Sequence, residues 1–342
     1  MTTQKAVVSS GPGKAELSTN RPIPTTRPGY VLVDVKAVAL NPTDWKHIDF
    51  IAPPNCVLGC DYAGVVAETG EGYDKQWKVG DRICGFVHGG NSLQNDDGSH
   101  QEKLVAKADI QIRIPDSLTF AEAATLGVAA ITCGQGLFQS LGLNFPNNPK
   151  NDGEPILIYG GSSAMGTMGV QLAKLAGYKV ISTSSPSNFA LVKSFGADEV
   201  FDYSDPDCAS KIKDYLNGKP RLAWDCISLE GSAKICADVL SGDGVYGSLY
   251  PVAFPRTDIP HKFTLGYTCF GEPVHKNETK INANPDDFVF MKEWIKVFEQ
   301  LLADGKLSLH PLKVNHGLEN VLDGVDLLRK NKVSGQKLVY IL

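Results

Sequence analysis

The stretch from residue 156 to residue 166, Ile156-Leu157-Ile158-Tyr159-Gly160-Gly161-Ser162-Ser163-Ala164-Met165-Gly166, decides the fold of this chain. A short apolar run leads into a turn of Gly and Ser, and small and apolar residues then recur at helical spacing as far as Ala176. Gly177 is placed to end this helix, and residues 179–183 form a second apolar run. The pattern predicts a strand–helix–strand unit of about 30 residues with parallel strands.

The turn of this unit suits a dinucleotide, because a pyrophosphate sits at a helix N-terminus and bulky side chains there would push it away. Ser163 replaces the middle glycine of the G-x-G-x-x-G pattern, and such a degenerate motif is weak evidence when it stands alone. A plain tight turn is the alternative. The strand, helix and second strand around the turn favour cofactor binding.

The residues that follow the second strand indicate which nicotinamide cofactor binds. NAD-binding proteins usually carry an acid here that bonds the ribose hydroxyls, whereas residues 182–188 contain none. Ser185, Ser187 and Asn188 can donate hydrogen bonds to a 2′-phosphate, which favours NADPH. The alternative is that these polar residues only cap the next helix.

Around this unit the chain divides into three regions. Residues 1–125 read as short strands broken by Gly and Pro, and residues 126–300 alternate helices with strands, including a strand at 263–267. Residues 301–342 return to short strands around one helix and are expected to pack on the first region. The sequence therefore predicts an α/β protein with a β-rich domain and a doubly wound parallel-sheet domain.

Composition excludes several classes of function. The 342 residues are 42% hydrophobic and 21% charged, and a net charge of -5 argues against a nucleic-acid-binding protein. We find no apolar run long enough to cross a membrane, no secretory signal and no lipidation motif, so a cytoplasmic protein is expected. The eight cysteines include no C-x-x-C pair and are expected to be buried thiols.

The order of domains resembles the medium-chain dehydrogenase/reductase superfamily, whose fold joins a GroES-like domain to a Rossmann domain. Its alcohol dehydrogenases bind a catalytic zinc through a Cys in the first loop, a His-Glu pair after a Gly, and a later Cys. Here the first loop carries Thr43-Asp44-Trp45-Lys46-His47, and Gly59 is followed by Cys60-Asp61. We therefore predict no metal. Without a Lewis acid, reduction of an activated C=C bond is the natural chemistry.

Several segments narrow the resemblance to the trans-acting enoyl reductases of fungal polyketide pathways, which serve a polyketide synthase or a polyketide–peptide hybrid synthase with an inactive enoyl reductase domain. The segments span nearly the whole chain: residues 41–47, 58–64, 159–163, 185–189, 196–203 and 333–337. The resemblance implies an NADPH-dependent reduction of α,β-unsaturated acyl thioesters. It also implies a transient partner, the acyl carrier protein domain of the synthase.

The resemblance implies a set of site residues. Those that would hold NADPH are Thr43, Asp44, Trp45, Lys46, Gly161, Ser162, Ser163, Ala164, Met165, Gly166, Ser185, Pro186, Ser187, Asn188, Tyr203, Leu249, Tyr250, Val333 and Ser334. Those that would line the acyl channel are Thr132, Cys133, Gly134, Gln135, Gly136, Leu137, Phe138, Gln139, Gly266, Tyr267, Thr268, Cys269 and Phe270.

Two of these residues are candidates for catalysis. Lys46 would stabilise the developing enolate oxygen or orient the cofactor ribose, and its alternative is a solvated loop lysine. Thr132 would hydrogen-bond the substrate, unless it bonds only its own helix backbone. Tyr62 and Tyr267 are possible proton donors, although each could be a packed core tyrosine and bound water could supply the proton.

Other functions and assemblies remain open from the sequence. A free-standing quinone or alkenal reductase would use the same cofactor unit, and a catalytically idle NADPH-binding partner protein is the second alternative. A carrier protein requires a basic docking patch, for which Lys5, Lys14, Lys103 and Lys107 are candidates. We expect a monomer, because Gly266 and the polar loop after it weaken the strand edge through which superfamily dimers pair.

Overall fold

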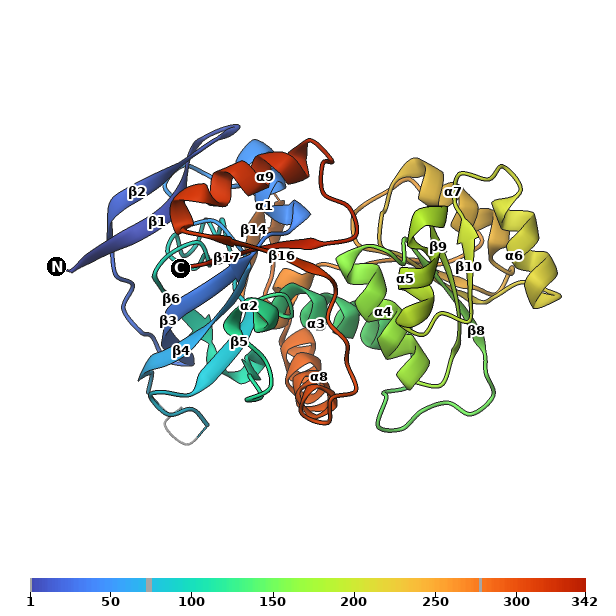
Figure 1. Cartoon of the computed structure of the whole chain (residues 1–342), viewed down its shortest axis with the longest axis horizontal. Helices are drawn as coiled ribbons and strands as arrows, with labels where there is room; N and C mark the ends of the chain where they lie inside the picture. Colours follow the sequence, from blue (N-terminus) through green and yellow to red (C-terminus); the bar gives the residue numbers. More distant parts are fainter. Residues whose placement is uncertain (1, 72–75, 277–278) are drawn as a thin grey trace. The chain divides into compact units, whose positions relative to one another are not determined.

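The computed structural model describes residues 2–71, 76–276 and 279–342 and separates them into two compact units (Figure 1). The first unit contains the chain up to Ile131, Tyr267–Ala303 and Pro311–Leu342; the second contains Thr132–Gly266 and Asp304–His310. This grouping differs from the predicted boundaries after residues 125 and 300. The reason is that helix α8 packs within the first unit, where the Trp294 indole donates to the Ala130 carbonyl at 2.8 Å.

The described residues of the second unit contain a six-stranded parallel sheet in the order β10-β9-β8-β11-β12-β13. Its strands are β8 Pro155–Tyr159, β9 Lys179–Ser184, β10 Glu199–Asp202, β11 Leu222–Asp225, β12 Val245–Ser248 and β13 His261–Phe263. Its helices are α4 Ala164–Leu175, α5 Phe189–Ser194, α6 Cys208–Leu216 and α7 Glu230–Val239. This strand order is that of a dinucleotide-binding sheet.

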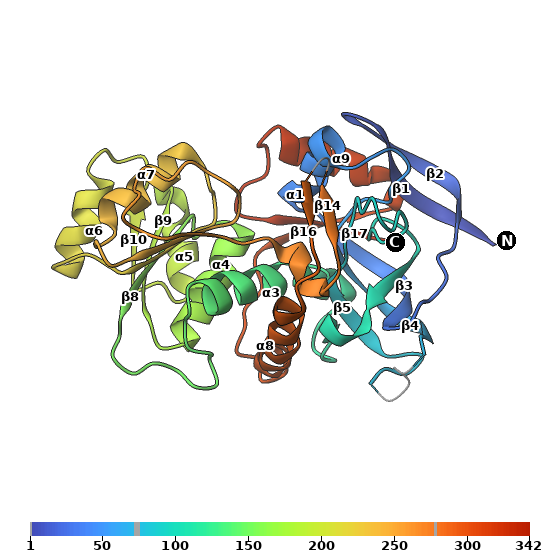
Figure 2. The ribbon, with the colours of Figure 1, turned by 180° about the vertical axis from the view of Figure 1, so that it is seen from behind.

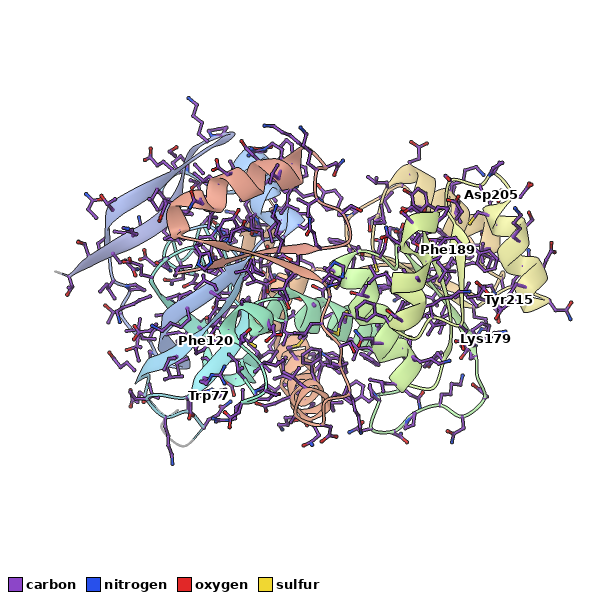
Figure 3. The ribbon with its side chains drawn as sticks, in the orientation of Figure 1. Trp77, Phe120, Lys179, Phe189, Asp205 and Tyr215 are labelled. Carbon is purple, nitrogen blue, oxygen red and sulfur yellow. The ribbon has the colours of Figure 1, made fainter. Side chains whose placement is uncertain are left out.

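The two central strands, β8 and β11, are mostly apolar because helices cover both faces of this sheet. Leu157 and Ala223 pack with Ile212 of α6 and Cys236 of α7 in one cluster. Trp224, the next residue on β11, faces the other way and meets α4. At the start of β9, the Lys179 ammonium lies 4.5 Å from the Tyr215 ring centroid (Figure 3).

The Trp224 indole is enclosed by glycines. A Cβ added at Gly136 would lie 2.5 Å from the indole nitrogen, and one at Gly169 of α4 would lie 2.4 Å from the ring. A Cβ added at Gly247 on the neighbouring strand would lie 3.1 Å from the same indole. The small residues of α4 therefore allow a fully buried tryptophan to fit beneath the helix.

We expect Gly169→Ala to destabilise the protein by about 1–3 kcal/mol, because the new methyl group overpacks the space beside Trp224. The matched control is Gly231→Ala in α7, where an added Cβ meets nothing within 4 Å. That change should stabilise by roughly 0.5–1 kcal/mol, since alanine favours the helix. Urea unfolding of both variants checks the pair, and equal midpoints would contradict the packing argument.

The first unit contains a mixed sheet that the described residues build in the order β16-β17-β3-β4-β5-β7, with β6 also paired to β3. The strands are β3 Tyr30–Ala39, β4 Asp61–Thr69, β5 Arg82–Phe86, β6 Lys103–Lys107, β7 Ile112–Arg113, β16 Leu312–His316 and β17 Lys337–Ile341. Two hairpins add β1 Thr3–Gly11 with β2 Lys14–Pro22, and β14 Val274–Lys276 with β15 Thr279–Ile281. Figure 2 shows the ribbon from behind.

The helices of the first unit are α1 Pro42–Lys46, α2 Phe120–Ala123, α3 Gly127–Cys133, α8 Pro285–Ala303 and α9 Val321–Arg329; α3 extends into the second unit at Thr132. Strand β17 lies between β16 and β3, so the C-terminal region packs on the β-rich region as predicted. Its core includes Tyr62, Ile83 and Leu104.

One element prediction is wrong. The chain leaves the sheet after Phe263 and forms a 3-10 helix at Gly266–Phe270, so no strand spans residues 263–267. The apolar run from 120 to 141 is divided among three helical segments. It forms α2, α3 and a π-helix at Gly134–Ser140, because Thr119 caps a first short helix that ends before Gly127.

Candidate active site

The loops that follow the strands of the second unit gather at the carboxyl edge of its sheet. The strand ends are aligned: Asp225 lies opposite both Tyr159 and Ser248, and Asp202 lies opposite Ser184. From β8 the chain continues to β9 and β10 on one side of the sheet, and from β11 it continues to β12 and β13 on the other side. Open α/β sheets bind their ligands at the point where the strand order reverses in this way. This edge is therefore the candidate cofactor site of the second unit.

The turn between β8 and α4 has the shape that a phosphate group needs. Gly160 has a φ of +82°. A Cβ at Gly161 would lie 2.1 Å from the Ser182 hydroxyl, and one at Gly166 would lie 2.2 Å from the Gly160 carbonyl. Neither Gly161 nor Gly166 has room for a Cβ, so only glycine fits these positions before and within the first turn of α4, where a phosphate group would bind.

Ser163 replaces the motif glycine for a structural reason. It is the N-cap of α4, where its hydroxyl accepts from the Gly166 N–H at 3.0 Å and donates to the Gly160 carbonyl at 2.8 Å. An N-cap serine satisfies one of the helix's free N–H groups. The departure from the glycine pattern therefore strengthens the turn.

The predicted 2′-phosphate residues form a short 3-10 turn after β9. The Ser185 hydroxyl accepts from the Asn188 amide at 3.0 Å and lies 3.1 Å from the Ser187 hydroxyl. Lys193, the nearest downstream cation, pairs with Glu199 at 2.7 Å. The side chains after β9 are therefore neutral hydrogen-bond donors, and no acid lies among them.

Three further predicted residues lie along the same edge, and one residue was missed. Tyr203 follows β10, and Leu249 and Tyr250 follow β12; both tyrosine side chains are about half exposed. Ile227, two residues beyond β11, is also exposed and lies against the Gly160 position. Its place after a fourth parallel strand was the signal that could have identified it.

In the first unit, helix α1 presents the predicted nicotinamide segment. Asn41 caps the helix, Pro42 follows it, and the Asp44 carboxylate accepts from the Asn41 N–H at 2.7 Å. The other Asp44 oxygen is buried with no hydrogen-bond partner among the described atoms. Burial raises the pKa of Asp44 to about 7, so this helix cap exchanges a proton near neutral pH.

Lys46 and Trp45 complete α1, and both are partly buried. The Lys46 ammonium lies 5.7 Å from the Trp45 ring centroid, and burial lowers the pKa of Lys46 below its ordinary value. Val333 and Ser334 precede β17, where Val333 packs against the core of the first unit and Ser334 is exposed. Lys46 is thus held by its helix and is not a freely extended surface lysine.

A buried ion pair holds the N-terminal end of α1 in place through Asn41. The Lys337 ammonium lies 2.6 Å from Asp61 Oδ2, with side-chain exposures of 5% and 0%. Lys337 also donates to Asn41 Oδ1 and to the Thr125 carbonyl, and Asp61 accepts from the Val128 N–H at 2.6 Å. This network joins β17, β4, α1 and the start of α3.

Next to α1, a polar cluster surrounds Lys276 of β14. We call it the Lys276 cluster: Thr43, His47, Cys60, His88, Tyr267 and Lys276. The Lys276 ammonium lies 2.6 Å from His47 Nε2 and 3.9 Å from the Tyr267 ring centroid. Sequence reasoning missed Lys276, because nothing local marks a lysine 229 residues from its partner.

The predicted acyl-channel residues fall on two unusual helices. Residues 134–139 lie in the π-helix of the second unit, where Gly136 approaches Trp224. Thr132 precedes them on α3 and is partly exposed. In the 3-10 helix, Tyr267, Cys269 and Phe270 are buried in the first unit. π-helical turns frequently occur at functional sites.

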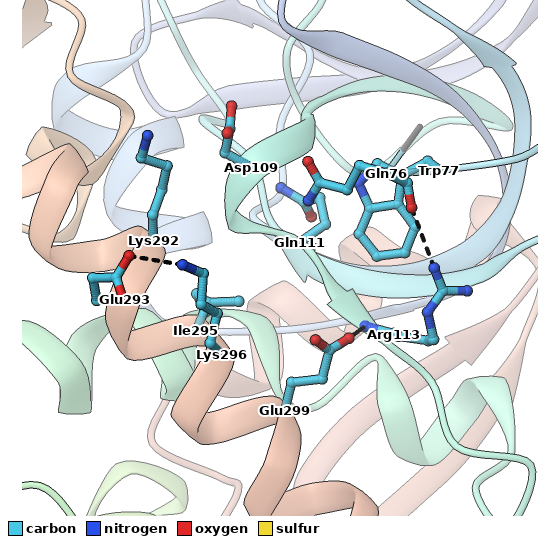
Figure 4. A pocket seen from close by; sticks show the side chains of 10 residues that line it. All are labelled: Gln76, Trp77, Asp109, Gln111, Arg113, Lys292, Glu293, Ile295, Lys296 and Glu299. Carbon is cyan, nitrogen blue, oxygen red and sulfur yellow. Dashed lines mark hydrogen bonds and ion pairs between the residues drawn. The ribbon is translucent and has the colours of Figure 1, made fainter. Parts of the chain in front are cut away.

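A separate hollow of about 410 Å³ lies in the first unit, away from these segments (Figure 4). It is lined by Gln76, Trp77, Asp109, Gln111, Arg113, Lys292, Glu293, Ile295, Lys296 and Glu299. Glu299 accepts from the Arg113 N–H at 2.7 Å, and Lys296 pairs with Glu293. Its polar groups largely satisfy one another, and it includes none of the predicted site residues.

Both units match known domain families. Residues 27–116 match the alcohol dehydrogenase GroES-like domain, and residues 164–271 match the zinc-binding dehydrogenase family. An alcohol dehydrogenase superfamily protein from Novosphingobium aromaticivorans superposes with a TM-score of 0.82 at 22% identity, covering 99% of this chain and 100% of that one. The structure of CurK enoyl reductase gives 0.79 at 19% identity, with 99% of each chain covered. The protein therefore has the medium-chain dehydrogenase/reductase fold that was predicted.

Curated relatives define the family within this superfamily. The trans-enoyl reductase resD of Aspergillus sclerotiorum is 45% identical, covering 98% of this chain and 99% of that protein. The trans-enoyl reductase TOXD of Cochliobolus carbonum is 51% identical over 80% of this chain and 92% of its own. The chain belongs to the trans-enoyl reductases, which confirms the predicted enoyl reductase. Reductases of this superfamily normally bind a nicotinamide cofactor.

The residues present do not fit the zinc that the second family description names. Asp61 forms an ion pair with Lys337, and the Lys276 ammonium lies 2.6 Å from His47 Nε2, where it would repel a metal cation. Burial raises the pKa of Cys60 to about 12, which opposes the thiolate that zinc requires. Within the described ranges, no three His, Cys, Asp or Glu side chains lie close enough to hold a metal ion.

Proposed function

We propose that this protein is an NADPH-dependent enoyl reductase that acts in trans on α,β-unsaturated thioesters carried by the acyl carrier protein domain of a polyketide synthase. The relatives named trans-enoyl reductases carry this proposal, because they match the chain from end to end. We further propose that it works in the cytoplasm. No helix in the described part of the chain is long and apolar enough to span a membrane.

The choice of NADPH is supported by the carboxyl edge of the second unit. The turn from Gly161 to Gly166 would hold the pyrophosphate, and Ser185 to Asn188 would hold the 2′-phosphate with neutral donors. Tyr203 would pack beside the adenine, and Tyr250 would border the nicotinamide half. The bound nicotinamide supplies the hydride that the β-carbon of the enoyl group receives.

The chain's own contribution is to hold the thioester and to stabilise charge on its oxygen. Lys46 is our candidate donor to that oxygen, because α1 holds its cation in a partly desolvated position. Thr132, near the end of α3, is a second candidate donor. Two lysines of the predicted basic docking patch form ion pairs, Lys103 with Asp34 and Lys107 with Glu272. Their positive charge is therefore partly neutralised, and we retain Lys5 and Lys14 as candidates.

The direct test incubates the protein with its synthase, NADPH and chain-building substrates, and reads product saturation by mass. A product two hydrogens heavier per reduced double bond supports the proposal. Faster turnover of small quinones than of any thioester would favour a free-standing quinone reductase. Cofactor binding without consumption of any enone would favour an idle partner protein.

Lys46→Ala is expected to lower kcat/KM for NADPH-dependent reduction of a crotonyl thioester roughly 10²–10³-fold, the usual effect of losing one oxyanion donor. Lys36→Ala, at an exposed position of β3, is the control and should leave the rate unchanged. Full activity of Lys46→Ala would remove Lys46 from the mechanism.

A further inference from the structure

Lys276 is a cation placed among neutral groups inside the first unit. The described groups that face it are His47 at the end of α1, Cys56 and Cys60 before β4, His88 after β5 and Tyr267 of the 3-10 helix. The salt bridges of the described chain give it no carboxylate partner. A lysine in such surroundings can bind and release its proton near neutral pH.

His47 is oriented to share this proton. Its Nδ1 lies 2.7 Å from the Thr43 carbonyl, which can only accept, so Nδ1 carries the hydrogen. Its Nε2 therefore presents a lone pair to the Lys276 ammonium at 2.6 Å. Burial and the nearby Lys276 charge hold the pKa of His47 well below its usual range. The two nitrogens thus form a pair of bases that share one proton.

The Tyr267 hydroxyl connects this pair to α1. It lies 3.5 Å from His47 Nε2, 3.1 Å from the Thr43 hydroxyl and 3.6 Å from the Cys60 sulfur. Its ring centroid lies 4.4 Å from that of His88, whose Nε2 is buried without a hydrogen-bond partner among the described atoms. The other candidate donor, Tyr62, is fully buried on β4 and bonds Gln111. Only Tyr267 of the two therefore has a proton source beside it.

We propose that Lys276 and His47 store the proton consumed by the reduction and that the Tyr267 hydroxyl delivers it to the substrate α-carbon. This rests on the proposed function and on the roles that the family resemblance implies, in which Thr43 lies beside the cofactor and Tyr267 lines the acyl channel. After the β-carbon has gained hydride, the α-carbon holds the electron pair of the former double bond. It forms a C–H bond as the Tyr267 O–H bond breaks. His47 Nε2 first takes a proton from the Lys276 ammonium and then passes it to the Tyr267 oxygen, and solvent reprotonates the partly exposed Lys276.

The chemistry of Lys276 suits this role. Burial lowers its pKa to about 7, and a proton donor is most effective when its pKa lies near the working pH. Cys60, the other acidic group beside Tyr267, has a pKa raised to about 12 by burial and releases no proton at neutral pH. The rate should therefore fall as pH rises through about 7, because Lys276 loses its proton.

The test compares Lys276→Met with Lys280→Met, an exposed lysine on the partner strand of the same hairpin. Lys276→Met should lower kcat for a crotonyl thioester roughly 10²–10⁴-fold and abolish the decline of kcat above pH 7, with NADPH affinity unchanged. Lys280→Met should match the wild type. Retention of wild-type kcat, or a slow variant with an unchanged pH profile, would overturn the proposal.

The cofactor-free protein provides a second readout. Between pH 7 and the ordinary lysine pKa near 10.5, the unfolded chain binds a proton at Lys276 that the folded protein does not. The melting temperature of the wild type relative to Lys276→Met should therefore rise with pH across this window and level off below pH 7. A flat difference would show that Lys276 does not titrate there and would overturn the proposal.

Tyr267→Phe decides the matter if Lys276→Met does not fold, because it removes only the delivering hydroxyl. It should bind NADPH normally and lose a similar fraction of kcat, and a fully active variant would refute the relay. Failure of the wild type to reduce any enoyl thioester would instead refute the proposed function. The two failures are therefore distinguishable in one set of assays.

Discussion

Lys337→Met is expected to lower the free energy of unfolding by about 3–5 kcal/mol, because it leaves the Asp61 carboxylate buried without its cation. Asp61 is completely inaccessible to solvent, and the lost ammonium also serves Asn41 and the Thr125 carbonyl. The change should also impair catalysis, since Asn41 caps the helix that presents Lys46. Chemical unfolding followed by circular dichroism measures the effect.

Two further variants test whether the loss of stability comes from the unpaired buried charge. The double variant Asp61→Asn/Lys337→Met removes both charges and should recover much of the lost stability, while its asparagine can still accept from the Val128 N–H. Lys330→Met, whose exposed ammonium lies 4.0 Å from Asp326, should change stability by about 0.5 kcal/mol or less. A loss below about 1 kcal/mol for Lys337→Met would contradict the importance of the pair.

Ser185→Asp is expected to lower kcat/KM with NADPH roughly 10²–10³-fold and to improve the use of NADH. A carboxylate at this position would face the 2′-phosphate, and like charges brought together cost several kcal/mol. With NADH the same carboxylate can accept from the ribose hydroxyls. Steady-state kinetics with both cofactors give the ratio directly.

Ser194→Asp is the matched control for charge alone. Ser194 is exposed at the opposite end of α5, where its hydroxyl bonds the Leu191 carbonyl. The added acid there should leave the cofactor preference unchanged. An equal loss in both variants would mean that the turn after β9 does not bind the 2′-phosphate.

The sequence predicted the elements and site residues that depend on near neighbours in the chain, and it did not predict contacts between residues far apart in the chain. The strand at Pro155–Tyr159, the glycine turn and α4 were readable because each is determined by neighbours within a few residues. Thr183 and Ser185 could be placed at the same edge because parallel strands align their carboxyl ends. Tertiary contacts had no such signal: Lys337 meets Asp61 across 276 positions, and Lys276 meets His47 across 229.

The wrong strand at 263–267 and the difference in domain boundaries have separate causes. Residues 263–267 are apolar enough to suggest a strand, but only His261–Phe263 pair with β12, and Gly266 begins a 3-10 helix. Alternation of helices and strands also cannot show which sheet a segment joins. Tyr267–Ala303 follows the last strand of the parallel sheet, yet it packs in the first unit through α8.

The position of β17 has a consequence for synthesis on the ribosome. Strands β3 and β4 emerge early, but β17, which pairs with β3 and supplies Lys337, is translated after nearly all of the described chain. Asp61 therefore has no Lys337 to pair with while the second unit is being translated. The parallel sheet of the second unit can assemble during this time. The sheet of the first unit and its buried ion pair can therefore be completed only after β17 has left the ribosome.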